Sequence, residues 1–252
     1  MIELGHKILG TGETQIMILH ELMGDHKNYE AILPYLDKTN FTYIFVDLRG
    51  YGLSKKISGE YSCEEAANDV KNLIGILKLV TVTLLAHSMS TMIAQKVALI
   101  DEPHISQLIL VTPITAAGIQ VPKISQDKLL GDFSHNDGNI EEIVRSSSKR
   151  HNESWIKNRI DMAYNSSILD ARVGYMKMYL TTNFLDEVPN IKVPIKIIVG
   201  KYDFSIFSLK TVTRLFSASY VNFEVCECQE AGHYPMLECP VYFAGKIEEF
   251  CS

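Results

Sequence analysis

The sequence predicts an α/β fold: a mostly parallel central sheet flanked by helices, with a helical insertion near the middle of the chain. Short apolar runs of strand type alternate with stretches of helical periodicity up to about residue 113, and this alternation resumes at about residue 190. Between these points helical patterns dominate over a stretch too long for a loop. We therefore expect a core domain formed by residues 1–113 and 190–252, with a helical lid, or cap domain, over residues 114–189.

Each expected strand is a short apolar run bounded by turn residues. The expected strands span residues 2–9, 15–20, 42–46, 82–86, 107–112, 194–200 and 221–228, the first of them a weakly alternating edge strand. Apolar residues three to four positions apart predict the helices. These cover residues 27–37, 63–77, 89–98, 140–150, 153–164, 171–180, 205–217 and 241–250. Strict alternation of strand and helix favours a parallel sheet, whose ligands bind at the carboxyl ends of the strands.

Composition and charge exclude several classes of protein. The 252 residues are 46% hydrophobic and 21% charged, which is typical of a globular protein. A formal net charge of -6, without a basic patch, argues against a general nucleic-acid-binding protein. The N-terminal residues lack a signal-peptide pattern, and no window of 18 uncharged apolar residues occurs. Together with an odd count of five cysteines, these features lead us to expect a cytoplasmic protein without a membrane partner.

The segment Thr83–Ala98 joins an expected strand directly to an expected helix, with Ser88 at the junction. A sharp strand-to-helix turn leaves little room for neighbouring side chains, and Ala86 and Ser90 on either side of Ser88 are both small. This is the requirement of a nucleophile elbow, which exposes a serine hydroxyl at a helix N-terminus. The usual Gly-x-Ser-x-Gly pattern has lost both glycines here, and a serine in this place can also act as a simple helix cap.

A nucleophilic serine needs a histidine base and a carboxylate that orients it, and both residue types follow later strands. Asp203 follows the strand expected at 194–200, and His233 follows the strand expected at 221–228. Either residue alone could be a helix cap or a surface loop residue. Their order in the chain, serine, aspartate and then histidine, is the order used in the α/β-hydrolase architecture.

Over nearly its whole length the chain resembles the α/β-hydrolase superfamily, in particular its lid-bearing esterase and lactonase members. The resemblance rests on the three residues above, on the loop Asp47–Ser54 and on the segment Gly232–Pro240, which is similar to the histidine loop of the family. It implies a catalytic triad of Ser88, Asp203 and His233, and it requires no cofactor and no metal. The loop Asp47–Ser54 is structural in that family.

The resemblance also implies an oxyanion hole made of two backbone N–H groups, those of Met89 and Leu22. Relatives carry a glycine where this chain has Glu21, within the segment His20–Gly24. We expect this carboxylate either to lie near the pocket mouth, where it would disfavour anionic acyl groups, or to face solvent. His20 and His87 are expected to be packed structural histidines.

The predicted lid is rich in aromatic residues and methionine, and most of these side chains are expected to pack within it. A minority facing the sheet would form a mainly apolar pocket with one or two hydrogen-bond donors. The pocket candidates, besides Glu21, are Trp155, Tyr164, Tyr175 and Tyr179. Such a pocket favours a small or medium, uncharged ester or lactone.

We therefore expect a serine hydrolase that cleaves a carboxylic ester or lactone through an acyl-enzyme on Ser88. Two alternatives stay open. The same triad could hydrolyse a carbon–carbon bond or transfer an acyl group, or the chain could be a weakly catalytic, receptor-like ligand-binding member of the fold. The expected partner is a small-molecule ester or lactone, and the protein is a monomer or a homodimer.

Overall fold

The computed structural model describes residues 2–136, 140–147 and 150–252. Within them, seven strands form a single sheet in the order β1-β3-β2-β4-β5-β6-β7. The strands are β1 (His6–Gly10), β2 (Thr14–Leu19), β3 (Phe41–Val46), β4 (Val82–His87), β5 (Ile105–Val111), β6 (Ile195–Gly200) and β7 (Phe223–Cys228). β1 pairs antiparallel with β3, and every other pairing is parallel, which confirms the mostly parallel sheet with an edge strand at its start.

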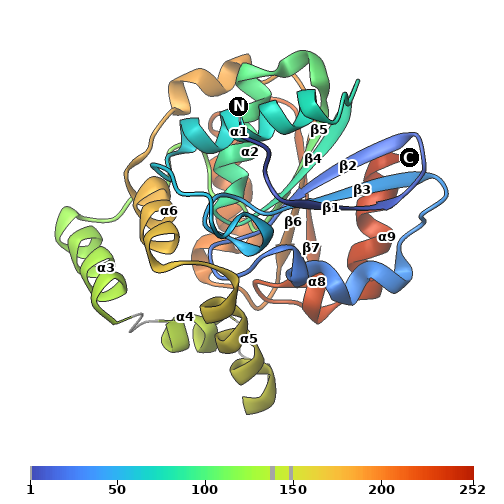
Figure 1. Cartoon of the computed structure of the whole chain (residues 1–252). Helices are drawn as coiled ribbons and strands as arrows, with labels where there is room; N and C mark the ends of the chain where they lie inside the picture. The colour runs from blue at the N-terminus through green and yellow to red at the C-terminus, as the bar shows by residue number, and fades with distance from the viewer. Residues whose placement is uncertain (1, 137–139, 148–149) are drawn as a thin grey trace.

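Helices cover both faces of this sheet (Figure 1). The α-helices are α1 (Cys63–Ile76), α2 (Ser90–Ile100), α3 (Lys123–Asn136), α4 (Ile140–Ser147), α5 (Glu153–Ser166), α6 (Leu169–Thr181), α7 (Leu209–Ser217), α8 (Pro235–Glu238) and α9 (Pro240–Cys251). Short 3-10 helices are η1 (His26–Tyr35), η2 (Gly52–Ser54), η3 (Glu102–His104), η4 (Leu185–Asn190) and η5 (Ser205–Phe207). α1 and α2 lie on one side of the sheet, whereas α9 lies on the other (Figure 1).

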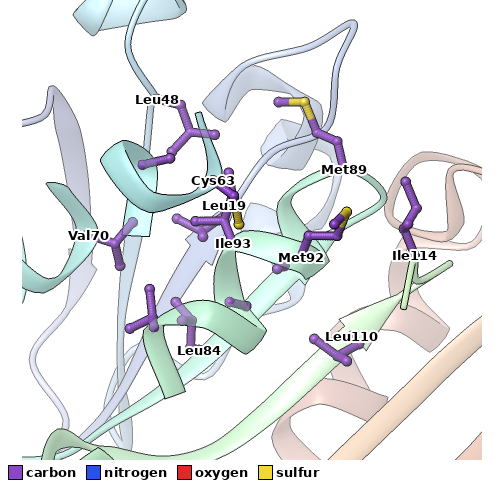
Figure 2. Packing of buried hydrophobic residues seen from close by; sticks show 14 of the residues in the cluster. Leu19, Leu48, Cys63, Val70, Leu84, Met89, Met92, Ile93, Leu110 and Ile114 are labelled. Atoms are coloured by element: carbon purple, nitrogen blue, oxygen red, sulfur yellow. The ribbon is translucent and has the colours of Figure 1, made fainter. Parts of the chain in front are cut away.

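The central strands β2 to β6 are largely apolar on both faces because each face packs against helices. Alternate residues of β2 separate accordingly: Met17 and Leu19 belong to one core cluster, and Ile16 and Ile18 belong to the other. Figure 2 shows the first cluster, in which side chains of α1 and α2 meet those of β2, β4 and β5. Burial on both faces holds the carboxyl ends of the central strands in a fixed arrangement.

Two expected helices differ from the structure. The segment expected as an α-helix over 27–37 is the 3-10 helix η1, which contains Pro34; proline has no N–H to donate and disfavours helical geometry at the residue before it. The helix expected over 205–217 is divided into η5 and α7 at Ser208, whose side chain caps the N-terminus of α7. α3 lies where the sequence pattern predicts no helix, and residues 148 and 149 of the helix expected over 140–150 lie outside the described residues.

Helices α3 to α6 are inserted between β5 and β6, and we call residues 114–189 the helical insertion. Its backbone is tied to loops at the carboxyl ends of the strands. The N–H of Ile168 donates to the carbonyl of Gly50 at 3.0 Å, and the N–H of His233 donates to the carbonyl of Ser147 at 3.1 Å. The insertion therefore lies against the edge of the sheet where Ser88 is located. Among the described helices, none has the length and apolarity needed to cross a membrane.

Candidate active site

Ser88 lies immediately after β4, in a left-handed backbone conformation with φ of 52°. This conformation is costly for a residue with a side chain and persists only where the surroundings enforce it. Three hydrogen bonds hold Ser88 in this conformation. The Ser88 N–H donates to the carbonyl of Val111 at 2.9 Å, and the Ser88 carbonyl accepts from the Thr91 N–H at 3.0 Å and from the Thr91 hydroxyl at 2.6 Å. The backbone thus has the geometry of the predicted elbow.

The residues that replace the two usual glycines fit this turn. Ala86 and Ser90 are both fully buried. The hydroxyl of Ser90 donates to the carbonyl of His20, at the end of β2, so this substitution ties the start of α2 to the loop expected to form the oxyanion hole. The loss of both glycines therefore leaves the elbow intact and adds a bond between its two neighbouring segments.

Asp203 and His233 meet beyond the ends of β6 and β7. Nδ1 of His233 lies 3.0 Å and 2.9 Å from the two carboxylate oxygens of Asp203. Gly200 permits this approach, because a Cβ atom there would lie 1.9 Å from the carbonyl oxygen of Gly232. With Nδ1 donating to the carboxylate, Nε2 of the neutral imidazole is left as the proton acceptor.

The loop that carries His233 is held by a carboxylate and a second histidine. The buried side chain of Glu238 accepts from the N–H groups of Gly232 and Tyr234, at 2.8 Å and 2.9 Å. On the other side of the loop, Nε2 of His87 donates to the carbonyl of His233 at 2.8 Å. With the bond from the His233 N–H to the helical insertion, four hydrogen bonds hold the backbone from Gly232 to Tyr234.

The surroundings of His233 favour its charged form. Burial alone would lower its pKa, but the charge and hydrogen bonds of Asp203, together with the carboxylates of Glu21 and Glu238, raise the pKa above the ordinary value of 6.5. Burial keeps the pKa of the neighbouring His87 well below its ordinary range, so His87 stays neutral. The site therefore stabilises an imidazolium at His233 and not at His87.

A cavity of about 190 Å³ opens onto Ser88 and His233. Its walls are mostly apolar and come from both the core and the helical insertion. The lining residues are Glu21, Leu22, Met23, Ser88, Ile114, Ile119, Ile143, Ser147, Tyr179, Phe204, Ile206, Phe207, His233 and Tyr234. Asp203 is absent from this lining, since it lies behind the imidazole.

Leu22 and Met89 have the features required of oxyanion donors. Leu22 lines the same cavity as Ser88, and Met89 follows Ser88 at the start of α2. Across the part of the chain that the structure describes, neither backbone N–H donates to a protein acceptor. The Leu22 carbonyl is held by the hydroxyl of Tyr51 at 2.7 Å, which restrains the peptide that follows Leu22.

Glu21 lines the cavity as expected, but its charge is not at an open pocket mouth. Its side chain is only 2% exposed and forms an ion pair with Arg159, with Nη2 and Oε1 3.1 Å apart. The expectation of a solvent-facing carboxylate is therefore wrong. The expected repulsion of anionic acyl groups also needs correction, because the positive charge of Arg159 offsets the carboxylate.

Of the other four pocket candidates, one lines the cavity and three do not. Tyr179 lines the cavity. Trp155 instead stacks on His151 and meets the ring of Tyr234 edge-on, with centroids 5.9 Å apart, so it supports a cavity residue from behind. Tyr175 is fully buried among other rings of the core, and Tyr164 is 45% exposed; neither contributes to the cavity.

His20 and His87 are both fully buried, as expected of packed histidines. Three residues at the site have no local sequence signal: Arg159, Asn28 and Ser147, each of which has a partner distant in the chain. Glu238 lies within the segment that resembles the family's histidine loop. That resemblance is the sequence feature that could have indicated a role for Glu238 at the site. No group of three or more residues able to hold a metal ion was found in the described residues.

The elbow, the histidine–aspartate pair and the parallel sheet together are those of an α/β hydrolase. The sequence model of the alpha/beta hydrolase fold family matches residues 15–239 of the chain, and the chain belongs to this family.

Among curated proteins, the AB hydrolase superfamily protein YisY of Bacillus subtilis is 34% identical over 108 residues, which is 42% of this chain and 40% of that protein. An uncharacterized protein of Mycobacterium tuberculosis is 29% identical over 42% of this chain and 30% of its own length. The matched segments thus span less than half of these curated relatives.

Solved structures match over much more of the chain. An esterase from Exiguobacterium antarcticum superposes with a TM-score of 0.86 at 23% identity, over 98% of this chain and 94% of its own. The enol-lactonase from Burkholderia xenovorans LB400 gives a TM-score of 0.81 at 18% identity, over 98% and 95%. At these identities the likeness concerns the fold.

Proposed function

We propose that this protein is a serine hydrolase that cleaves a small or medium, uncharged carboxylic ester or lactone through an acyl-enzyme on Ser88. One observation carries the proposal: Ser88, on a strained turn, and His233, hydrogen-bonded to Asp203, open onto the same cavity. A serine hydroxyl becomes a useful nucleophile only with such a base beside it.

The geometry supports the following sequence of steps. Nε2 of His233 accepts the proton of the Ser88 hydroxyl as the oxygen attacks the carbonyl carbon, and Asp203 holds the imidazole and stabilises its charged form. The N–H groups of Leu22 and Met89 stabilise the oxyanion. His233 then protonates the leaving alcohol, and a water molecule, activated by the same histidine, hydrolyses the acyl-enzyme.

The cavity supports the substrate class. It is small and lined largely by aliphatic and aromatic side chains, and its one carboxylate is paired with Arg159. Such a surface suits an apolar acyl or alkyl group without net charge. An esterase and an enol-lactonase among the structural neighbours are compatible with this class.

We also propose that the helical insertion acts as the lid of this site. Ile119, Ile143, Ser147 and Tyr179 of the insertion line the cavity, facing the residues contributed by the core. A lid of this kind separates the site from bulk solvent, while leaving room for the water molecule of deacylation, and sets the length of the group that fits.

The test is hydrolysis of graded p-nitrophenyl esters and aliphatic lactones by the native protein, by Ser88→Ala and by the matched control Ser58→Ala, whose serine is exposed. We expect Ser88→Ala alone to lose about 10⁴- to 10⁶-fold in kcat and to escape labelling by a fluorophosphonate. Labelling of Ser88 without ester turnover, together with cleavage of a diketone, would identify carbon–carbon hydrolysis instead. Saturable ligand binding without labelling would identify a binding protein.

A further inference from the structure

Glu21 and Arg159 form an ion pair that is buried on both sides, with 2% and 3% of the side chains exposed. Removing a carboxylate and a guanidinium from water is costly, and a pair of packed apolar side chains often gives equal or greater stability. The pair also joins segments 138 positions apart: the turn after β2 and helix α5 of the insertion. Stability alone therefore does not account for it.

The two carboxylate oxygens of Glu21 have different partners. Oε2 accepts from the N–H of Met23, two residues further on. Oε1 accepts from Nδ2 of Asn28 at 2.9 Å and from Nη2 of Arg159 at 3.1 Å. Arg159 completes the ring of contacts, since Nη1 donates to Oδ1 of Asn28 at 2.8 Å. We call Glu21, Asn28 and Arg159 the clasp.

Hydrogen bonds also restrain the backbone on both sides of Leu22. The carbonyls of Glu21, Leu22 and Met23 accept hydrogen bonds from Nδ1 of His20 at 2.7 Å, from the hydroxyl of Tyr51 at 2.7 Å and from Nη2 of Arg159 at 3.3 Å. With the Met23 N–H bound to Glu21, the backbone on both sides of the Leu22 N–H is restrained, while that N–H has no acceptor among the residues that the structure describes. The turn is thus held with one donor free beside the cavity.

Arg159 also reaches the loop that carries the predicted base. Its guanidinium carbon lies 4.1 Å from the ring centroid of Tyr234, the residue after His233. One side chain of the insertion therefore contacts both the turn of Leu22 and the loop of His233. Because the contact needs α5 in its docked position, undocking α5 would release both loops at once.

We propose that the clasp makes the oxyanion hole depend on the insertion: Arg159, acting through Glu21, is a positioning residue that holds the Leu22 N–H toward the substrate carbonyl. This inference rests on the proposed hydrolase function. It assigns to Glu21, at the position of a glycine in relatives, the task of shaping the turn through its side chain. The insertion then contributes to the chemical step as well as to covering the cavity.

The test compares Arg159→Met, Glu21→Gln and the double variant Glu21→Gln/Arg159→Met with the native enzyme. Misplacing an oxyanion donor lowers kcat by about 10- to 100-fold, and we expect that loss in all three with KM changed by less than about threefold. Affinity for a trifluoromethyl ketone, whose adduct carries an oxyanion, falls in parallel with kcat. The matched control is Arg145→Met, an arginine of α4 that forms ion pairs with Glu141 and Glu153 of the insertion.

The double variant separates positioning from charge compensation, because it leaves no unpaired buried charge. If it regains native kcat and inhibitor affinity, the clasp serves only to neutralise charge, and the proposal is overturned. A second measurement does not need turnover: hydrogen exchange of the backbone over residues 21–24. We expect faster exchange there in Arg159→Met and not in Arg145→Met; equal exchange in both would overturn the clasp. If the native protein neither hydrolyses esters nor reacts with a fluorophosphonate, the proposed function fails, while the exchange result still decides the clasp.

Discussion

Replacing Asp203 with asparagine tests the predicted base most directly. In the native protein, Nδ1 of His233 donates to both oxygens of a buried carboxylate at 2.9 Å and 3.0 Å, which leaves Nε2 free to accept a proton. Asparagine has nearly the same volume, but its amide can present N–H toward Nδ1. The imidazole then adopts the other tautomer, with the proton on Nε2, and no longer accepts the proton of Ser88.

The expected loss follows from this change of tautomer and from the loss of the charge that stabilises the imidazolium. We expect kcat to fall about 10⁴-fold, equivalent to roughly 5 kcal/mol of transition-state stabilisation. KM should change little, because Asp203 does not line the cavity. The assay is steady-state hydrolysis of the preferred p-nitrophenyl ester, with circular dichroism to verify folding.

Asp186→Asn provides the matched control, since this aspartate is exposed in η4 of the insertion. Its kcat should stay within about twofold of the native value, as is usual for surface substitutions. A loss of less than tenfold in folded Asp203→Asn would refute the assignment of Asp203 as the orienting carboxylate. A rise in KM equal to the fall in kcat/KM would refute the tautomer argument, because it would indicate a role in binding.

Three further predictions concern pH dependence and stability. The carboxylates of Asp203, Glu21 and Glu238 raise the pKa of His233, and the base must be neutral to act. We therefore expect kcat/KM to rise with pH, with a midpoint above 6.5. A pH profile of kcat/KM over about pH 5 to 8 checks this, and a midpoint below 6.5 would contradict it. Arg49→Met removes two hydrogen bonds to Asp69 and should lower the free energy of unfolding by about 1–3 kcal/mol in urea titrations with kcat unchanged. Phe243→Ala removes a fully buried side chain of α9, on the face of the sheet opposite to α1 and α2. The same titration should show a loss of about 3–5 kcal/mol in the free energy of unfolding.

Several parts of the site could be predicted because each depends on a local pattern. A strand such as β4 is a short apolar run, buried on both faces, that leads into a residue able to occupy a tight turn. The positions of Asp203 and His233 just after β6 and β7 follow from the rule that parallel strands place their carboxyl ends at one edge of the sheet. The loop of Asp47 is also structural as predicted, since its carboxylate accepts from the N–H groups of His26 and Leu53.

Errors arose where the local pattern is ambiguous. Apolar spacing alone does not distinguish an α-helix from the 3-10 helix η1, in which Pro34 and short-range bonds such as that from Asn28 N–H to the Asp25 carbonyl prevail. α3 has few apolar residues at regular spacing, so periodicity gave no prediction for it. The aromatic residues of the insertion illustrate a similar ambiguity, because Tyr175 packs in the core and Tyr179 reaches the cavity although they are four residues apart.

By itself, the sequence determined the class of fold, the order of the strands along the chain and the three residues proposed for the chemistry, because these depend on short-range periodicity and on residues adjacent to strand ends. Only the tertiary structure decided the role of Glu21. Its partners Asn28 and Arg159 lie 7 and 138 positions away, and no pattern along the chain links them. The physical reason is that a buried charge takes its function from the groups that replace water around it, and folding alone brings those groups together.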